Sequence, residues 1–220
     1  MDQSSPVGVS FGVTIPRDIA NSQINGVAFI GKAGVGKTTL AQEVAKLYRI
    51  PVVPLAARLK HMVHNMLGHH NISYTTDQPK ETIRPLYQAF GQFMRDIKGP
   101  DYWLEALPQQ YPYIIDDVRY TNEVKFLYEK GFYLIHVKGP SRLASEMLNP
   151  NHSSEQGLDA DHVAQHVDMV LYNEGTIKES LDYIMDVLTF LPWRKTDIPF
   201  QEYLVSAMTR LRKEREKDGE

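Results

Sequence analysis

The sequence of 220 residues has no cysteine, no strong excess of one charge and no long apolar run. Without cysteine there is no disulfide framework, no thiolate metal ligand and no thiolate nucleophile, so stability must come from an ordinary buried core. The formal net charge of -3 argues against a dedicated nucleic-acid binder, which normally carries a basic excess. No apolar run approaches the ~20 residues of a membrane span, and the N-terminus lacks a signal-peptide pattern. We therefore expect a cytoplasmic protein that binds neither nucleic acid nor membrane.

Short apolar runs alternate with longer amphipathic stretches along most of the chain. The apolar runs predict five strands, at residues 27–30, 52–55, 113–115, 132–137 and 167–172. The amphipathic stretches predict helices, at residues 38–48, 56–67, 81–97, 121–130 and 176–191. We expect Gly68 to cap the second helix, and Pro85 to start the third or lie in its first turn. This alternation favours an α/β fold with a five-stranded parallel sheet flanked by helices.

The two ends of the chain lie outside this alternation. Apolar residues at odd positions from Val7 to Ile15 suit an edge strand or an arm on a partner subunit, and a flexible extension fits equally well. Helical spacing returns near the C-terminus. We therefore expect one domain at residues 25–191, an N-terminal extension or edge strand at 1–24 and a helical extension at 192–220.

A glycine-rich segment joins the first predicted strand to the first predicted helix. Its spacing is Gly-x-x-x-x-Gly-Lys-Thr, from Gly31 to Thr38. In such a loop, glycines let backbone N–H groups converge on phosphate oxygens at a helix N-terminus. Lys37 is placed to reach the β and γ phosphates, and Thr38 to ligate magnesium. We therefore expect ATP and Mg²⁺ to bind here, at Gly31, Lys32, Ala33, Gly34, Val35, Gly36, Lys37, Thr38 and Thr39.

Two carboxylates, Asp116 and Asp117, end the third predicted strand. Ligands of open α/β sheets collect at the carboxyl ends of the strands, so one of the pair is expected to hold the metal. We assign Asp116 to magnesium, together with Thr38. The other carboxylate is equally a candidate to cap the helix that begins near Thr121.

Three arginines, Arg84, Arg95 and Arg119, are predicted to face the rim of the phosphate loop, and Arg142 lies in the polar segment that could close over it. Phosphoryl transfer needs cations around the transferred group, and a guanidinium group binds phosphate through two parallel hydrogen bonds. Any one of these arginines, taken alone, is better explained as an exposed surface charge. The segments that surround these arginines favour a role in binding phosphate.

Two segments carry a more specific pattern than the glycine loop. Residues 84–91 read Arg-Pro-Leu-x-Gln-x-x-Gly, and residues 117–123 read Asp-Val-Arg-Tyr-x-Asn-Glu. Together with the stretch through Arg95 to Trp103, they resemble the acceptor region of bacteriophage deoxynucleoside monophosphate kinases. Weaker similarity lies at residues 59–60, 152–158 and 173–176, and the resemblance runs from about residue 25 to about residue 191.

The resemblance implies a nucleoside monophosphate kinase fold with a helical acceptor-binding region at about 56–108 and a lid at about 139–160. The implied reaction transfers the γ-phosphoryl group of ATP to a deoxynucleoside monophosphate, giving the diphosphate and ADP. Gln88 and Trp103 would contact the acceptor base, Asn173 would lie near the ATP base, and Arg142 would move with the lid. The implied catalytic residues are Lys37, Arg84, Arg95, Arg119 and Arg142. The implied substrate-binding residues are Lys60, Arg84, Gln88, Arg95, Trp103, Asp117, Arg119 and Glu155.

The expected partner is therefore a small-molecule nucleotide, and a homodimer is left open. If the resemblance to bacteriophage enzymes extends to the source, the location is the host cytoplasm. Two other functions fit the same phosphate loop. The chain would then be a kinase for another small acceptor, such as a sugar or a coenzyme precursor, or an ATP-dependent interaction module.

Overall fold

The computed structural model describes residues 11–13, 23–70, 72, 80–142, 158 and 161–193. The strands are β1 (Phe11–Val13), β2 (Gly26–Ile30), β3 (Tyr113–Val118), β4 (Phe132–Lys138) and β5 (Met169–Tyr172). The helices are α1 (Lys37–Tyr48), α2 (Ala57–His69), α3 (Lys80–Lys98), the 3₁₀ turn η2 (Leu104–Ala106), α4 (Thr121–Glu129), α5 (Asp161–Ala164) and α6 (Ile177–Leu188).

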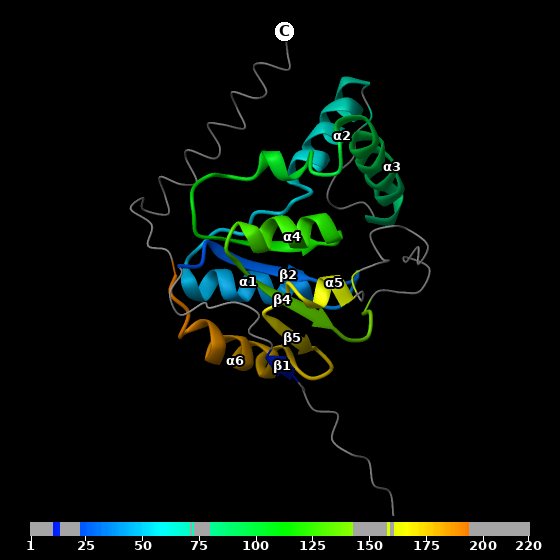
Figure 1. Ribbon diagram of the computed structural model, residues 1–220. Coiled ribbons are helices and arrows are strands. Elements are labelled where there is room, and N and C mark those ends of the chain that lie inside the picture. The colour runs from blue at the N-terminus through cyan, green and yellow to red at the C-terminus, as the bar shows by residue number, and fades with distance from the viewer. Residues whose placement is uncertain are drawn as a thin grey trace, which may run out of the picture.

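The strands form one sheet in the order β1-β5-β4-β2-β3 (Figure 1). Four of them, β2 to β5, run parallel to one another, whereas β1 pairs antiparallel with β5. Strand β2 lies between β3 and β4, so the chain turns to the opposite side of β2 after β3. In open α/β sheets, ligands bind outside the carboxyl ends of the strands at such a reversal. The glycine loop that follows β2 lies at this point.

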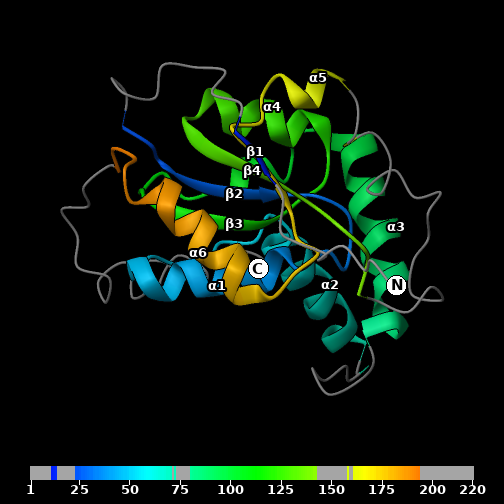
Figure 2. The ribbon, with the colours of Figure 1, turned by 90° about the horizontal axis from the view of Figure 1, so that it is seen from below.

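Helices cover both faces of the sheet, as the view in Figure 2 shows: α1 and α6 lie on one side, and α4 and α5 on the other. Leu40 and Val44 of α1 pack in one apolar cluster with Ile184 of α6. Val124 of α4 and Val163 of α5 belong to a second cluster on the opposite face. Because the central strands are buried on both sides, their sequences are continuous apolar runs rather than alternating ones. The predicted α/β fold with a parallel sheet flanked by helices is confirmed.

The count of five parallel strands is not confirmed. Residues 52–55 form no strand, because their contact with the sheet is reduced to a single bridge between Val52 and Ile114. The Val53 N–H donates to the Ile114 carbonyl at 2.7 Å, but Pro51 and Pro54 carry no N–H group with which to extend the ladder. The fifth strand of the sheet is instead β1, which supplies an antiparallel edge.

Three helix and strand boundaries also differ from the predicted ones. Helix α2 continues to His69, so Gly68 lies inside the helix and is not its cap. Helix α3 begins at Lys80, which places Pro85 in its second turn rather than its first. Strand β3 continues to Val118, so both aspartates lie within the strand. Apolar spacing marks the middle of an element better than its ends.

Several predicted features fall outside the described residues. They include most of the lid, Glu155 within it, and the extension from residue 194 onward. Among the helices of the described ranges, none is both long enough and apolar enough to cross a bilayer.

We expect Gly26→Ala to destabilise the protein and Gly68→Ala to stabilise it. A Cβ atom at Gly26 would lie 2.0 Å from the Tyr113 carbonyl oxygen of the neighbouring strand, at a φ of +156°. A Cβ atom at Gly68 meets nothing within 4 Å. Overpacking a buried backbone contact costs about 1–3 kcal/mol, whereas alanine for glycine inside a helix gains about 0.5 kcal/mol.

Chemical denaturation of the two variants and the wild type measures both effects. A destabilising Gly68→Ala would contradict the helical assignment of residue 68, since alanine is disfavoured only at a left-handed cap.

Candidate active site

The glycine loop runs from the end of β2 to the first residue of α1. Gly34 and Gly36 have φ values of +81° and +97°, a region that residues with a Cβ atom rarely adopt. Lys37 is only 5% exposed. Its ammonium group reaches back across the loop and donates to the Lys32 carbonyl at 2.6 Å. The loop backbone therefore binds the ammonium group of Lys37, the residue that the motif assigns to phosphate.

Asn173 and Arg142 lie against this loop from outside. The Asn173 Nδ2 donates to the Val35 carbonyl at 2.8 Å, and its Oδ1 accepts from the Ser180 hydroxyl at 2.9 Å. The Arg142 guanidinium donates to the carbonyls of Val35 and Asn173 at 3.3 and 3.1 Å. Sequence reasoning expected Asn173 near the ATP base and Arg142 in a lid. The structure places both side chains on the loop backbone.

The two neighbouring aspartates of β3 have different surroundings. Asp117 accepts the Leu55 N–H at 2.7 Å and the Ala56 N–H at 3.0 Å, directly before α2 begins at Ala57. Burial raises the pKa of the Asp117 carboxyl, and the nearby Asp116 charge raises it further. Asp117 therefore holds the start of α2. Sequence reasoning had offered the helix at Thr121 as the one to be capped.

Asp116 is 7% exposed, and its Oδ1 is a buried oxygen without a hydrogen-bond partner among the described residues. The aspartate lies in β3 beside β2, the strand that leads into the glycine loop. Carboxylate and hydroxyl oxygens are the ligands that Mg²⁺ takes from proteins. The unsatisfied oxygen makes Asp116 a candidate magnesium ligand, and Thr38 is the second candidate that the loop motif offers.

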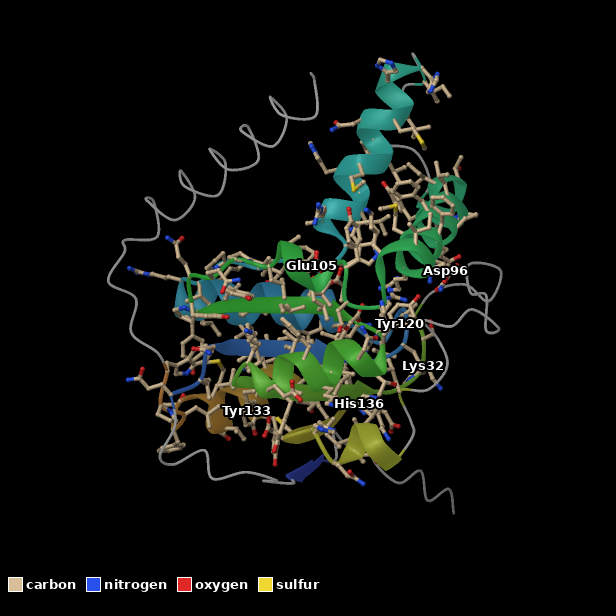
Figure 3. All side chains as sticks on the ribbon, turned by 45° about the horizontal axis from the view of Figure 1, so that its top comes forward. Lys32, Asp96, Glu105, Tyr120, Tyr133 and His136 are labelled. Carbon is tan, nitrogen blue, oxygen red and sulfur yellow. The ribbon has the colours of Figure 1, made fainter. Side chains whose placement is uncertain are left out.

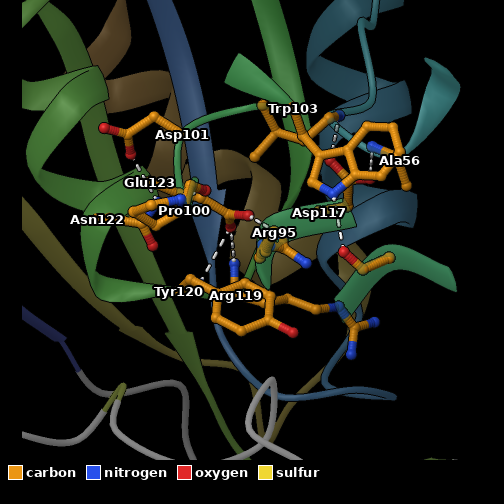
Figure 4. A network of polar contacts seen from close by, with 12 residues as sticks. Ala56, Arg95, Pro100, Asp101, Trp103, Asp117, Arg119, Tyr120, Asn122 and Glu123 are labelled. Atoms are coloured by element: carbon orange, nitrogen blue, oxygen red, sulfur yellow. Dashed lines mark hydrogen bonds and ion pairs between the residues drawn. The ribbon is translucent and has the colours of Figure 1, made fainter. Parts of the chain in front are cut away.

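Glu123, in the first turn of α4, connects three elements (Figure 4). Its Oε1 accepts from the Arg95 Nη2 of α3 at 2.9 Å. Its Oε2 accepts the backbone N–H groups of Arg119 and Tyr120 at 2.8 and 3.0 Å. Glu123 is 3% exposed, so these contacts are shielded from water. One buried carboxylate thereby fixes the turn after β3 and the guanidinium group of Arg95.

The Arg95 guanidinium also lies over the ring of Tyr120, 3.9 Å from its centre. Cation–π contacts of this kind are stronger when both groups are shielded from water. Arg95 is therefore held by Glu123 at one edge and by Tyr120 across its plane.

A pocket opens between α2, α3 and the turn that follows β3. Six of the predicted site residues line it: Arg84, Gln88, Arg95, Trp103, Asp117 and Arg119. The remaining lining residues are Leu55, Ala56, Leu59, Tyr87, Gly91, Tyr120 and Glu123. Lys60 is exposed and is not among the lining residues.

Sequence patterns indicated little about the residues that support this pocket. Tyr87 and Glu123 stand within the two specific motifs but were assigned no role. In the structure, the Tyr87 hydroxyl contacts the His64 Nε2 of α2 at 2.5 Å, which joins the two helical walls. The place of Tyr87 within the motif at residues 84–91 was the sequence feature that could have indicated a position in the pocket wall. The partner histidine comes from another helix and carried no signal of its own.

Trp103 has a structural contact beside its place in the pocket. Its ring N–H donates to the Gly91 carbonyl at 3.2 Å, and the side chain is 3% exposed. Asp101 accepts from the Asn122 amide at 2.8 Å, which joins the same turn to α4. Trp103 therefore offers the pocket an apolar ring face, while its only hydrogen-bond donor is occupied by the protein.

The pocket and the glycine loop lie at the same end of the sheet. Ile30, before the loop, pairs with Val118, before Arg119. Figure 3 shows the labelled Lys32 and Tyr120 at this end, whereas Tyr133 lies in the opposite half of the sheet. The pocket therefore lies at the end of the sheet from which the glycine loop extends.

A family model described as deoxynucleotide monophosphate kinase matches residues 70–184, slightly more than half of the chain. The chain belongs to the deoxynucleotide monophosphate kinase family. No curated protein matched the sequence. The family match begins after the glycine loop, so the loop is a separate indication of nucleotide binding. The parallel sheet and its loop at the reversal after β2 are those of an α/β P-loop kinase fold.

Solved kinases were also found by structural comparison. A sugar kinase from Janibacter sp. HTCC2649 is 17% identical, with 77% of this chain and 96% of that chain covered and a TM-score of 0.42. A shikimate kinase from Aquifex aeolicus vf5 is 13% identical, with 74% and 96% covered and a TM-score of 0.39. A gluconokinase from Sinorhizobium meliloti 1021 is 15% identical, with 77% and 98% covered and a TM-score of 0.40.

We expect Glu123→Gln to change how the stability of this kinase depends on pH. Burial raises the pKa of the Glu123 carboxyl above its ordinary 4.5, against the opposing effects of the Arg119 N–H and the Arg95 charge. A carboxyl group with a raised pKa binds its proton more tightly in the folded state than in the unfolded state. The wild type should therefore gain free energy of unfolding relative to Glu123→Gln as the pH falls through the raised pKa towards 4.5.

Denaturation of both proteins at a series of pH values measures this difference. If the wild type instead lost stability relative to the variant over that range, Arg95 would be holding the pKa below 4.5, and burial would not dominate.

Proposed function

We propose that the protein transfers the γ-phosphoryl group of ATP to the phosphate of a deoxynucleoside monophosphate. The bond from the γ-phosphorus to the bridging oxygen breaks, a bond to an acceptor phosphate oxygen forms, and ADP and a deoxynucleoside diphosphate leave. The observation that carries the proposal is the pocket beside the glycine loop, in which three arginines face the same space as Gln88. Membership of the deoxynucleotide monophosphate kinase family supports the choice of acceptor.

The arginines of the pocket suit the acceptor phosphate and the transferred group. Arg84 comes from α3, Arg119 follows β3, and Arg95 is held in place by Glu123. A nucleoside monophosphate carries up to two negative charges, which bidentate guanidinium groups bind well. Gln88 presents both a donor and an acceptor to a base, and the ring of Trp103 supplies an apolar face. We assign recognition of the base to these two residues.

On the nucleotide side, the loop from Gly31 to Gly36 would hold the phosphates and Lys37 would contact the transferred group. Asp116 and Thr38 would hold Mg²⁺, which neutralises phosphate charge when it is bound. Direct in-line transfer needs no covalent intermediate, because the acceptor phosphate oxygen is already a nucleophile. The protein therefore contributes position and positive charge.

We expect transfer from magnesium-ATP to at least one of dAMP, dGMP, dCMP and dTMP, and its loss in Lys37→Ala. Release of ADP, measured with each acceptor in turn, tests the reaction. Removal of a group that stabilises charge in the transition state lowers kcat by roughly 10²–10³-fold. The unfolding temperature of the variant serves as the control for folding. Turnover with none of the four acceptors would sink the proposal, and a sugar or another small acceptor that restored it would identify a different kinase.

We expect Arg84→Ala to raise KM for the deoxynucleotide by roughly 10-fold to 100-fold, since hydrogen bonds to charged groups contribute about 1.5–3 kcal/mol. The KM for ATP should hardly change. Arg58→Ala is a matched control, because Arg58 lies over the Tyr102 ring and outside the pocket lining. Initial rates at varied concentrations of each substrate separate the two constants. Equal effects of the two arginine variants would contradict the assignment of Arg84 to the acceptor.

A further inference from the structure

Asn173 follows β5 and lies far from the glycine loop in the sequence, yet its side chain is directed at that loop. The side chain is 1% exposed. Its Nδ2 donates to the Val35 carbonyl at 2.8 Å, and its Oδ1 accepts from the Ser180 hydroxyl at 2.9 Å. Ser180 is fully buried in α6. The Val35 carbonyl can only accept, so it selects the orientation of the amide that places an N–H towards the loop, and the Ser180 hydroxyl donates to the Oδ1 on the other side.

The backbone of Asn173 is fixed as well. Its N–H donates to the Lys138 carbonyl at the end of β4, at 2.7 Å. Its carbonyl accepts from Arg142, and the same guanidinium group donates to the Val35 carbonyl. The contact between Asn173 and the loop is also tight, because a Cβ atom on Gly36 would lie 2.5 Å from the Asn173 Nδ2. A residue held at both its backbone and its side chain forms a rigid support.

The carbonyl that Asn173 holds belongs to the peptide between Val35 and Gly36. A trans peptide is planar, so its N–H points away from its carbonyl. With the Val35 carbonyl turned outward to Asn173 and Arg142, the Gly36 N–H is turned to the inner side of the loop. The preceding peptide, between Gly34 and Val35, also has its carbonyl bonded outside the loop, since the Gly34 carbonyl accepts the Arg142 backbone N–H at 3.0 Å. These are the N–H groups that a phosphate-binding loop requires to point inward.

We propose that Asn173 is a positioning residue that orients the Val35–Gly36 peptide, so that the Gly36 N–H faces the phosphates of the bound nucleotide. This inference rests on the proposed nucleotide site. It replaces the expected contact with the ATP base by a contact that acts through the loop backbone. The effect of Asn173 is therefore on any ligand with a chain of phosphates, whether or not it carries a base.

Inorganic tripolyphosphate has the phosphates of ATP without its base, so binding of the two ligands separates the two roles. We expect Asn173→Ala to weaken the binding of both by the same factor, about 5- to 10-fold for the loss of one hydrogen bond. Asn173→Asp should weaken both by a larger factor, because a carboxylate cannot donate to the Val35 carbonyl and repels phosphate. Ser180→Ala should weaken both by a smaller factor. Titration calorimetry with magnesium present measures each Kd without any turnover.

Asn122→Ala is the matched control. It removes an amide of the same kind from α4, where it donates to the Pro100 carbonyl and to Asp101 on the acceptor side. It should leave the Kd of tripolyphosphate unchanged.

Loss of ATP affinity with unchanged tripolyphosphate affinity in Asn173→Ala would overturn the inference and restore the contact with the base. Unchanged affinity for both ligands would overturn it too. If Asn173→Ala does not fold, Ser180→Ala decides on the same two criteria. A wild type that binds both ligands but phosphorylates no deoxynucleotide would overturn the proposed function, while an equal loss in Asn173→Ala would still support the positioning role.

Discussion

The acceptor side of this kinase depends on one buried carboxylate, that of Glu123. Its two oxygens bind the Arg95 guanidinium and two backbone N–H groups after β3, so α3, α4 and the sheet meet at a single group. A buried ion pair contributes little net stability, because removing both charges from water costs about as much as their attraction gains. Its value here is geometric. Arg95 lines the pocket with its guanidinium group held by Glu123 and by the ring of Tyr120.

The acidic groups of the site fall into two kinds. Asp117 and Glu123 have raised pKa values through burial and accept hydrogen bonds from backbone N–H groups, so they hold the walls in place. Asp116 differs, with a buried oxygen that no described residue satisfies. Buried polar atoms are normally satisfied, and an exception calls for an explanation such as an ion. Adjacent residues of one strand thus have different surroundings, because successive side chains point to opposite faces.

The sequence predicted the α/β fold, the family and six of the thirteen residues that line the pocket, because these follow from local spacing and motifs. It could not predict contacts between distant segments. Nothing near Leu55 indicates that Asp117 would accept its N–H, and nothing near Val35 indicates Asn173, 138 positions away. Two prolines also limit the pairing at Val52 to a single bridge, because they lack the N–H groups that further pairing with β3 would need. Apolar periodicity predicts which side chains are buried. It does not predict which distant residue each side chain will contact, because that depends on how the whole chain folds.

The hydrogen bond from Lys37 to the Lys32 carbonyl has a consequence for nucleotide affinity. A lysine side chain carries about 2 kcal/mol of rotamer entropy, which is lost when the ammonium group is fixed. In this protein the side chain is 5% exposed and hydrogen-bonded to the loop itself, so folding removes most of that freedom. A phosphate bound by Lys37 would replace the Lys32 carbonyl as the acceptor and would not have to order a mobile cation. The rotamer entropy lost by Lys37 therefore lowers the free energy of unfolding and does not lower the affinity for the nucleotide.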